Sequence, residues 1–291
     1  MVALVKRNGT LMSDSTIIAD ENTTIMDDPV TAAVRERDRD VLSLVREALD
    51  EKRVMLAYQP VVRADRPDRP AYYEGLIRIM DRTGRIIPAR DFIDSIETDE
   101  IGRIIDCLSL ELGLEALKTQ PGLRLAINMS ARSIGYPRWN RILHRALKAD
   151  HTIGERLILE ITERSAMVIP DIVRVFMAGL QSRGICFALD DFGAGFTSFR
   201  YLKEFYFDIL KIDGQFIRDI HKTPDNQVLC AALVSIAQHF DMFTVAEMVE
   251  TAEDADYLID AGLDCLQGYY FGVPKLRLDW DRPEENHRKA G

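Results

Sequence analysis

Residues 185–213 read ICFALDDFGAGFTSFRYLKEFYFDILKID and contain two short apolar runs that carry charged residues at or near their ends. Asp190 and Asp191 close the first run, and Lys211 lies within the second. Runs of this length that are rich in β-branched and aromatic residues are typical of buried strands. This stretch therefore predicts two strands of a sheet whose ends carry charged groups.

The same alternation of short apolar runs and longer helical patterns extends outward through the chain. Helices are predicted at residues 101–118, 139–148, 172–183, 226–240 and 252–261. Strands are predicted at residues 54–62, 71–79, 123–130, 156–163, 185–192, 206–213, 242–249 and 265–272. This order predicts an α/β fold, a modified TIM (β/α)8 barrel. The first two strands are too close in sequence for a parallel crossover, so we expect a hairpin and one antiparallel strand.

The two ends of the chain differ in composition from its middle. Residues 1–38 contain many acidic, Ser and Thr residues but few large apolar side chains, which is typical of a flexible leader. An amphipathic helix is expected from about Asp40 and opens the folded part. We therefore assign residues 39–277 to the barrel and residues 278–291 to a polar C-terminal tail.

Composition limits the classes of partner. The formal net charge of −10 disfavours binding to polymeric nucleic acid and to anionic membranes. No apolar run approaches the roughly 18 residues that cross a bilayer, and the polar N-terminal stretch lacks the apolar centre of an export signal. We therefore expect a cytoplasmic protein without a membrane segment.

Polar residues that could carry chemistry lie within or at the ends of seven of the eight predicted strands. They are Glu74, Asn128, Glu160, Glu163, Asp190, Asp191, Lys211, Glu247, Glu250 and Gln267. In barrels of this class the chemistry lies at the carboxyl ends of the strands. Buried carboxylates need compensation, which divalent cations can supply. Oxygen ligands without His or Cys favour Mg²⁺ or Mn²⁺, and adjacent aspartates such as Asp190 and Asp191 suit a pair of bridged metals.

Each residue alone also has a structural interpretation. A carboxylate near a strand end often forms a surface ion pair or caps a helix, and Asn128 could cap a segment that begins at Ser130. Lys211 could be solvated, and Gln267 could bond to the backbone. The joint pattern, rather than any single residue, indicates a site.

From Leu42 to Pro274 the chain resembles the EAL family of cyclic di-GMP phosphodiesterases. The shared segments, in family order and at similar spacing, are AYQPVV, YEGLIR, INMS, LEITE, DDFGAGFTSFRYLKEF, DILKID, AEMVE and QGYYFGVP. The family fold is a modified eight-stranded barrel with one antiparallel strand, which agrees with the hairpin expected from the strand spacing. The resemblance implies metal-dependent hydrolysis of cyclic di-GMP to linear pGpG.

The resemblance also implies roles for the site residues. The site would hold two divalent cations, Mg²⁺ or Mn²⁺. The ligands of the first would be Glu74, Asn128, Glu160 and Asp190. The ligands of the second would be Asp190, Asp191 and Glu247. Lys211 would position or polarise the attacking water, Gln267 would support the water and the substrate, and Glu250 would act from behind the ligands. Gln59, Arg78 and Pro274 would contact the nucleotide, although Arg78 could instead be an exposed cation at a strand end.

The loop after Asp191 is expected to join the metal site to a homodimer interface in the same family. Glu163 would stabilise this loop, and Phe196 and Phe199 would supply apolar contact between subunits. Alternatively, both phenylalanines could pack beneath the loop within one subunit and make no contact between subunits.

Three positions depart from the family pattern without removing a ligand. Gly75 replaces the alanine of the signature tripeptide, Met248 replaces a small residue, and Phe196 stands where tyrosine is common. Two rival functions stay open. The chain could be a catalytically silent receptor for cyclic di-GMP, or a protein-interaction module whose loop matters more than its pocket.

Overall fold

The computed structural model describes residues 29–193 and 202–278. The chain divides into two compact units, Met1–Arg39 and Asp40–Gly291. Helix α1 (Pro29–Asp50) begins in the first unit, so residues 29–38, which composition assigns to a flexible leader, are helical instead. Proline is accepted in a first helical turn, and alanine, arginine and glutamate form helices without large apolar side chains. Composition alone therefore misses this segment.

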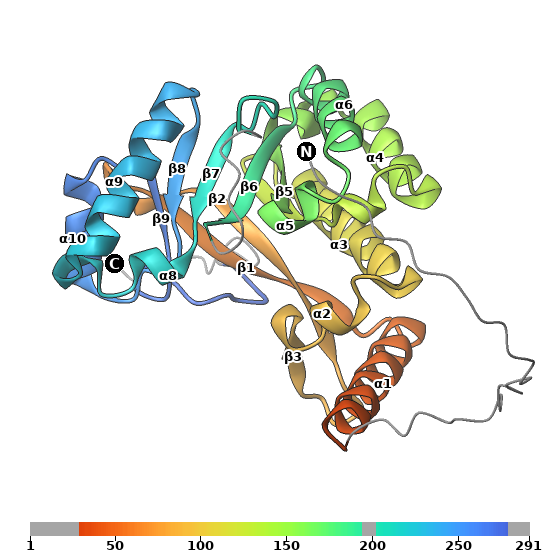
Figure 1. Ribbon diagram of the computed structural model, residues 1–291. Coiled ribbons are helices and arrows are strands. Elements are labelled where there is room, and N and C mark those ends of the chain that lie inside the picture. The colour runs from red at the N-terminus through yellow and green to blue at the C-terminus, as the bar shows by residue number, and fades with distance from the viewer. Residues whose placement is uncertain (1–28, 194–201, 279–291) are drawn as a thin grey trace, which may run out of the picture. The chain divides into compact units, whose positions relative to one another are not determined.

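Nine strands form the sheet of the second unit (Figure 1). They are β1 (Val54–Arg63), β2 (Arg66–Met80), β3 (Ile86–Pro88), β4 (Leu125–Asn128), β5 (Leu157–Thr162), β6 (Cys186–Phe192), β7 (Ile209–Ile212), β8 (Phe243–Ala246) and β9 (Cys265–Gln267). Their order is β1-β9-β8-β7-β6-β5-β4-β2-β3, and pairing of β1 with β2 closes eight of them into a barrel. β1 runs antiparallel to both β2 and β9, which confirms the modified barrel and its hairpin.

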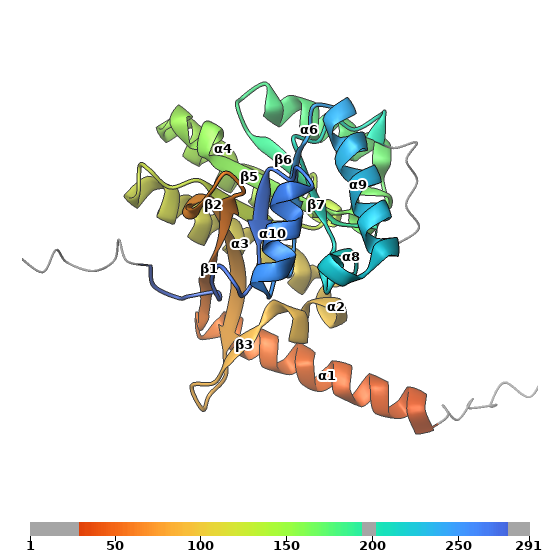
Figure 2. The same cartoon turned by 90° about the vertical axis from the view of Figure 1, so that its left-hand side faces the viewer.

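Five longer helices lie around the outside of the barrel, as Figures 1 and 2 show. They are α3 (Glu100–Thr119), α4 (Pro137–Ala149), α6 (Pro170–Gln181), α9 (Pro224–His239) and α10 (Ala252–Asp260). Proline occupies the first turn of α4, α6 and α9, where its missing N–H costs no hydrogen bond. No helix in the described ranges is both long and apolar enough to span a membrane.

Shorter elements lie in the connections between the strands and the longer helices, and one of them, η3, leads from α4 into the start of β5. They are α2 (Ile93–Ile96), α5 (Glu163–Ala166), α8 (Gly214–Ile217), and the 3₁₀ helices η1 (Ala89–Asp91), η2 (Ala131–Ser133), η3 (His151–Arg156) and η4 (Ile220–Lys222). The strand β3 and the helix η1 are not predicted by periodicity, because three residues are too few to show a pattern.

The last barrel strand is shorter than its sequence suggests. Residues 268–272 are rich in aromatic residues, yet β9 ends at Gln267. Backbone N–H groups of Phe271 and Gly272 bond to the carbonyl of Gly268 and form a turn. A Cβ at Gly268 would lie 2.0 Å from the carbonyl oxygen of Val249, so only glycine allows this close approach.

Apolar residues form a core in two layers. One cluster packs the outer face of the sheet against the helices. The second fills the barrel interior, and we call it the barrel floor; it consists of Val61, Tyr72, Ala126, Ile158, Ala188, Ile209 and Val245. Side chains two residues apart on a strand share a face. Residues two positions beyond the floor, toward the carboxyl end, must therefore also point into the barrel.

Candidate active site

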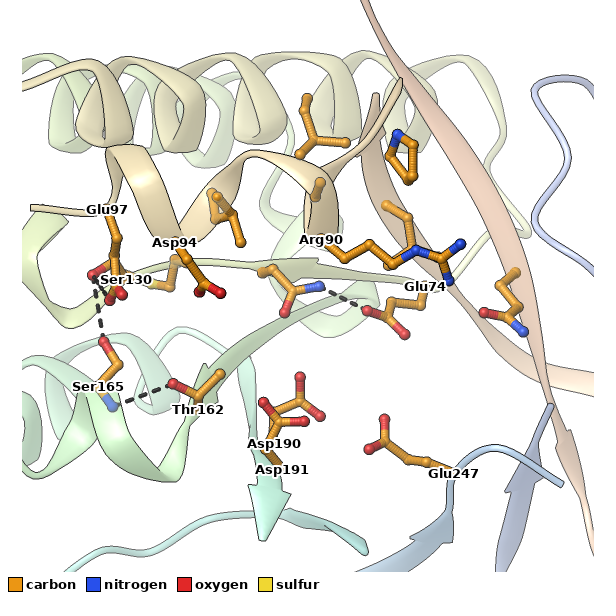
Figure 3. Close-up of a pocket in the computed structure, with 18 of the residues that line it drawn as sticks. Glu74, Arg90, Asp94, Glu97, Ser130, Thr162, Ser165, Asp190, Asp191 and Glu247 are labelled. Atoms are coloured by element: carbon orange, nitrogen blue, oxygen red, sulfur yellow. Dashed lines mark hydrogen bonds between the residues drawn. The ribbon is translucent and has the colours of Figure 1, made fainter. Parts of the chain in front are cut away.

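The predicted polar residues converge at the carboxyl end of the barrel, directly above the barrel floor. Six of them lie two residues after a floor residue: Glu74, Asn128, Glu160, Asp190, Lys211 and Glu247. Gln267 follows Cys265, which packs against the floor, by the same spacing. In Figure 3 the carboxylates of Glu74, Asp190, Asp191 and Glu247 face the same space. Alternation along seven strands thus gathers groups that are far apart in sequence.

Lys211 lies at the centre of this group and is only 1% exposed. Its Nζ lies 2.8 Å from Asp190 Oδ1, 2.9 Å from Glu160 Oε2 and Glu247 Oε1, and 3.4 Å from Glu74 Oε2. Burial alone would lower the pKa of Lys211, but these carboxylates outweigh it and raise the pKa well above its usual value. Lys211 therefore stays charged and is no solvated surface residue.

The surrounding carboxylates differ in the direction of their pKa shifts. Burial raises the pKa of Glu160 and of Glu247 well above the ordinary value, although Lys211 opposes it. Burial also opposes ionisation of Glu74, but Lys211 and two amides lower the pKa of this group. The amides are Gln267 Nε2 and Asn128 Nδ2, each 2.7 Å from a Glu74 oxygen. Glu74 is thus held as an anion, and Asn128 serves the site rather than capping η2, a cap that Ser130 provides.

Asp190 and Asp191 can face the same site because the strand is irregular there. Adjacent side chains on a strand normally point to opposite faces. The pairing of β6 with β7 shifts register between Leu189 and Phe192, and Asp191 has a φ of +54°. Oxygen atoms of Asp190, Asp191 and Glu247 consequently lie within 4.8 Å of one another. Burial, with the charge of Asp190, raises the pKa of Asp191 to about 6.

The donor set fits hard divalent cations. All the ligand candidates offer carboxylate or amide oxygens, which Mg²⁺ and Mn²⁺ prefer. Glu160 Oε1 is buried without a hydrogen-bond partner among the described residues, an arrangement that is costly unless a cation or a donor compensates it. The cluster of Asp190, Asp191 and Glu247 provides a second group of close oxygens.

A cavity of about 1060 Å³ opens above the cluster. Its walls include four residues expected to act on or near the substrate, namely Gln59, Arg78, Glu250 and Pro274. Arg78 is half-buried and donates to the carbonyl of Ile77 at 2.9 Å, so it is no fully exposed strand-end cation. Gln59 is buried and donates to the carbonyl of Gly272 at 3.1 Å. Glu250 is exposed on the wall.

The residues assigned to the loop after Asp191 are only partly described. Glu163 is buried at the start of α5, and its Oε2 accepts a hydrogen bond from the Gly193 backbone N–H at 3.2 Å. This contact ties the end of β6 to the neighbouring strand connection. Phe196 and Phe199 lie outside the described residues, so their contact between subunits stays a prediction.

Two departures from the family pattern have local explanations. A Cβ at Gly75 would lie 2.8 Å from Cδ1 of Ile127, so an alanine there requires that side chain to move. Met248 has a φ of +55°, a left-handed conformation that glycine adopts with less strain. Its side chain lies against Gly214, and its Sδ accepts from Arg218 Nη2 at 3.6 Å.

Several residues of the cavity wall were not predicted. Arg90 in η1 follows the unpredicted strand β3, and Figure 3 shows its side chain extending toward Glu74. Asp106 in α3 accepts from the Ser130 backbone N–H at 3.0 Å and from Ser133 Oγ at 2.5 Å. Burial raises the pKa of Asp106 to about 7. The sequence signal that could have identified Asp106 is its position as a charged residue within the apolar stretch IIDCLSL.

A sequence model of the EAL domain matches residues 43–274 of this chain. Cyclic di-GMP phosphodiesterase PdeF of Escherichia coli K12 is 29% identical over 245 residues, which are 82% of this chain and 32% of PdeF. The chain spans about a third of the length of the curated relatives that it matches first.

Solved structures agree with this assignment. The EAL domain of FimX from Pseudomonas aeruginosa, bound to c-di-GMP, superposes with a TM-score of 0.75 at 26% identity and covers 83% of this chain and 99% of that domain. Klebsiella pneumoniae BlrP1, in a manganese and c-di-GMP complex, gives a TM-score of 0.67 at 28% identity and covers 77% of this chain and 56% of BlrP1. The chain with this barrel and this acidic cluster therefore belongs to the EAL domain family.

Proposed function

We propose that this chain hydrolyses cyclic di-GMP to linear pGpG with two divalent cations, Mg²⁺ or Mn²⁺. The observation that carries the proposal is the buried group of carboxylates around Lys211 at the carboxyl end of the barrel, beneath a cavity of about 1060 Å³. The names of PdeF and of the BlrP1 complex support the substrate and the use of a divalent metal.

The charges of the site support two cations. Glu74, Glu160, Asp190, Asp191 and Glu247 bring five negative charges when ionised, and Lys211 brings one positive charge, which leaves four negative charges. Two divalent cations would neutralise them. One would bind Glu74, Asn128, Glu160 and Asp190, and the other would bind Asp190, Asp191 and Glu247. When bound, such cations lower the pKa of water and neutralise phosphate charge.

The side chains around the cations divide the remaining work. Lys211 keeps its proton, so it acts as a hydrogen-bond donor that orients water or phosphate and not as a base. Gln267 fixes the orientation of Glu74 with its amide, 2.7 Å away. Arg78 presents a guanidinium to the cavity, and this group pairs well with a phosphate. Gln59 and Pro274 shape the wall beside it, and Glu250 acts from the exposed rim.

Hydrolysis by the purified chain tests the proposal. The chain and a Glu74→Ala variant are incubated with cyclic di-GMP and Mg²⁺ or Mn²⁺, and the products are separated by chromatography. Glu115→Gln on α3 serves as the control, because Glu115 is exposed and, among the described residues, forms an ion pair with Lys118 alone. We expect pGpG from the wild type and from Glu115→Gln, and none from Glu74→Ala. Nucleotide binding without any product would refute hydrolysis and favour the receptor.

The homodimer is a separate part of this proposal. The dimer would form through the loop after Asp191. Glu163 accepts a hydrogen bond from the Gly193 backbone N–H at the start of this loop. Sedimentation velocity of the wild type and of Phe199→Asp measures it. We expect a dimer for the wild type and a larger monomer fraction for the variant, and a monomeric wild type would contradict the proposed contact.

A further inference from the structure

Tyr72 differs in chemistry from the rest of the barrel floor. The other six members are valine, alanine and isoleucine residues, whereas Tyr72 brings a hydroxyl into the barrel interior. The residue is only 6% exposed. It lies on β2 two residues before Glu74, so its side chain shares the interior face with that ligand candidate.

Four buried polar atoms have no hydrogen-bond partner among the described residues: the hydroxyl of Tyr72, Oε1 of Glu160, Oε1 of Gln267, and Oδ1 of Asp190, which is ion-paired with Lys211. The first two concern the position of Glu160. A buried tyrosine hydroxyl usually finds a partner, and a buried carboxylate oxygen needs one even more. One atom can donate and the other can accept, so the two groups are complementary.

Tyr72 packs in the same buried cluster as Ile158, and Glu160 follows Ile158 by two residues on β5, so both side chains enter the same barrel interior. Burial is the largest cause that raises the pKa of Tyr72 well above its usual value, and the charge of Glu160 is the next. Lys211 acts in the opposite direction and is the third cause. These influences agree with the placement of Tyr72, Glu160 and Lys211 in one barrel interior.

We infer that Tyr72 positions Glu160 by donating a hydrogen bond, through one buried water molecule, to Glu160 Oε1. A site between two polar groups suits such a water, and Gln267 Oε1 is a further buried oxygen without a partner among the described residues. Glu160 Oε2 is held by Lys211 at 2.9 Å. Both oxygens of Glu160 would then be restrained, and its orientation as a ligand would be fixed before a cation binds.

This inference rests on the proposed function, because it assigns Tyr72 to the support of a metal ligand. Groups that orient a ligand without touching the metal typically contribute about 10-fold to 100-fold to metal affinity. Tyr72→Phe keeps the ring in the floor and removes only the hydroxyl. Tyr73→Phe is a matched control, because Tyr73 is the next residue of the same strand and points to its opposite face.

The test uses the full chain and Mn²⁺ alone, with no nucleotide. Free Mn²⁺ is measured by electron paramagnetic resonance during titration, and the near-ultraviolet difference spectrum reports whether a tyrosine senses the bound ion. We expect Mn²⁺ binding to weaken about 10-fold to 100-fold in Tyr72→Phe, with loss of the tyrosine difference signal. Tyr73→Phe should keep both the affinity and the signal of the wild type.

Each other outcome overturns the inference. If Tyr72→Phe keeps the Mn²⁺ affinity and the tyrosine signal of the wild type, the role of Tyr72 is refuted while the proposed function still stands. Equal losses in Tyr72→Phe and Tyr73→Phe would have the same meaning. Failure of the wild type to bind Mn²⁺ would refute the proposed function as well. A high-resolution crystal structure of the wild type gives a measurement that does not depend on a variant, because it must show water density between the Tyr72 hydroxyl and Glu160.

Discussion

Replacing Lys211 by methionine removes the central ammonium of the site but keeps an unbranched side chain of similar length. The ammonium contacts the carboxylates of Glu74, Glu160, Asp190 and Glu247, and its side chain is 1% exposed. Without it, these carboxylates would repel one another in a buried environment. We therefore expect Lys211→Met to lower the free energy of unfolding of the metal-free chain.

The size of this loss follows from the burial of the site. Removal of one partner from a buried ion pair costs about 3–5 kcal/mol, because the remaining charge stays buried and uncompensated. Protons can replace part of the lost charge. The pKa of Glu160 and of Glu247 is already raised by burial, so each binds more protons in the folded state than in the unfolded state. Such groups make stability fall as the pH rises from their unfolded pKa toward their folded pKa.

The expected loss is therefore largest at neutral and alkaline pH. Urea unfolding in the presence of a chelator measures it, with the fluorescence of buried Trp139 as the signal. The experiment is repeated with saturating Mn²⁺, which supplies positive charge to the same carboxylates and should restore most of the stability. Lys222→Met is the control, because Lys222 is exposed and pairs with Asp219 on the surface. Its unfolding midpoint should equal that of the wild type.

Two results would refute this account of the site. Equal stability of Lys211→Met and the wild type without metal would mean that the carboxylates are already neutral. A loss that Mn²⁺ leaves unchanged would mean that Lys211 acts through packing and not through charge. The hydrolysis of cyclic di-GMP by Lys211→Met should fall strongly in either case, so activity alone does not distinguish these explanations.

The site also predicts three smaller effects. Because the pKa of Asp191 is raised to about 6, Mn²⁺ affinity should increase as the pH rises through that value, and Asp191→Asn should weaken this part of the dependence when free Mn²⁺ is titrated at each pH. Met248→Gly should relieve the left-handed strain and raise the free energy of unfolding by about 0.5–1 kcal/mol in urea, whereas a decrease would show that the contact with Gly214 matters more. Arg78→Ala should raise KM for cyclic di-GMP roughly 10-fold to 100-fold while Mn²⁺ affinity stays the same, and a change in Mn²⁺ affinity would place Arg78 with the metal ligands instead.

The order of strands and helices was predictable because most of the long elements carry an apolar period, whereas the start of α1, at residues 29–38, lacks one. The gathering of polar groups was also predictable, since a barrel brings the carboxyl ends of its strands together. The geometry at Asp191 was not, because a strand pattern places adjacent aspartates on opposite faces and gives no sign of a φ of +54°. Arg90 escaped prediction for a different reason, since it depends on a strand of only three residues, Ile86–Pro88.

Proton uptake, the ammonium of Lys211 and bound cations all compensate the same negative charge. Under the proposed function the three would be linked, because a bound cation would favour the deprotonated forms of Glu160 and Glu247, whose pKa values burial raises. When Lys211 is removed, the carboxylates should take up more protons at low pH and bind divalent cations more strongly at high pH. The barrel makes this exchange effective, because the carboxylates lie on or directly after different strands whose floor residues pack together below them. The same repulsion that costs stability in the metal-free chain would thus provide the affinity for divalent cations that the proposed function requires.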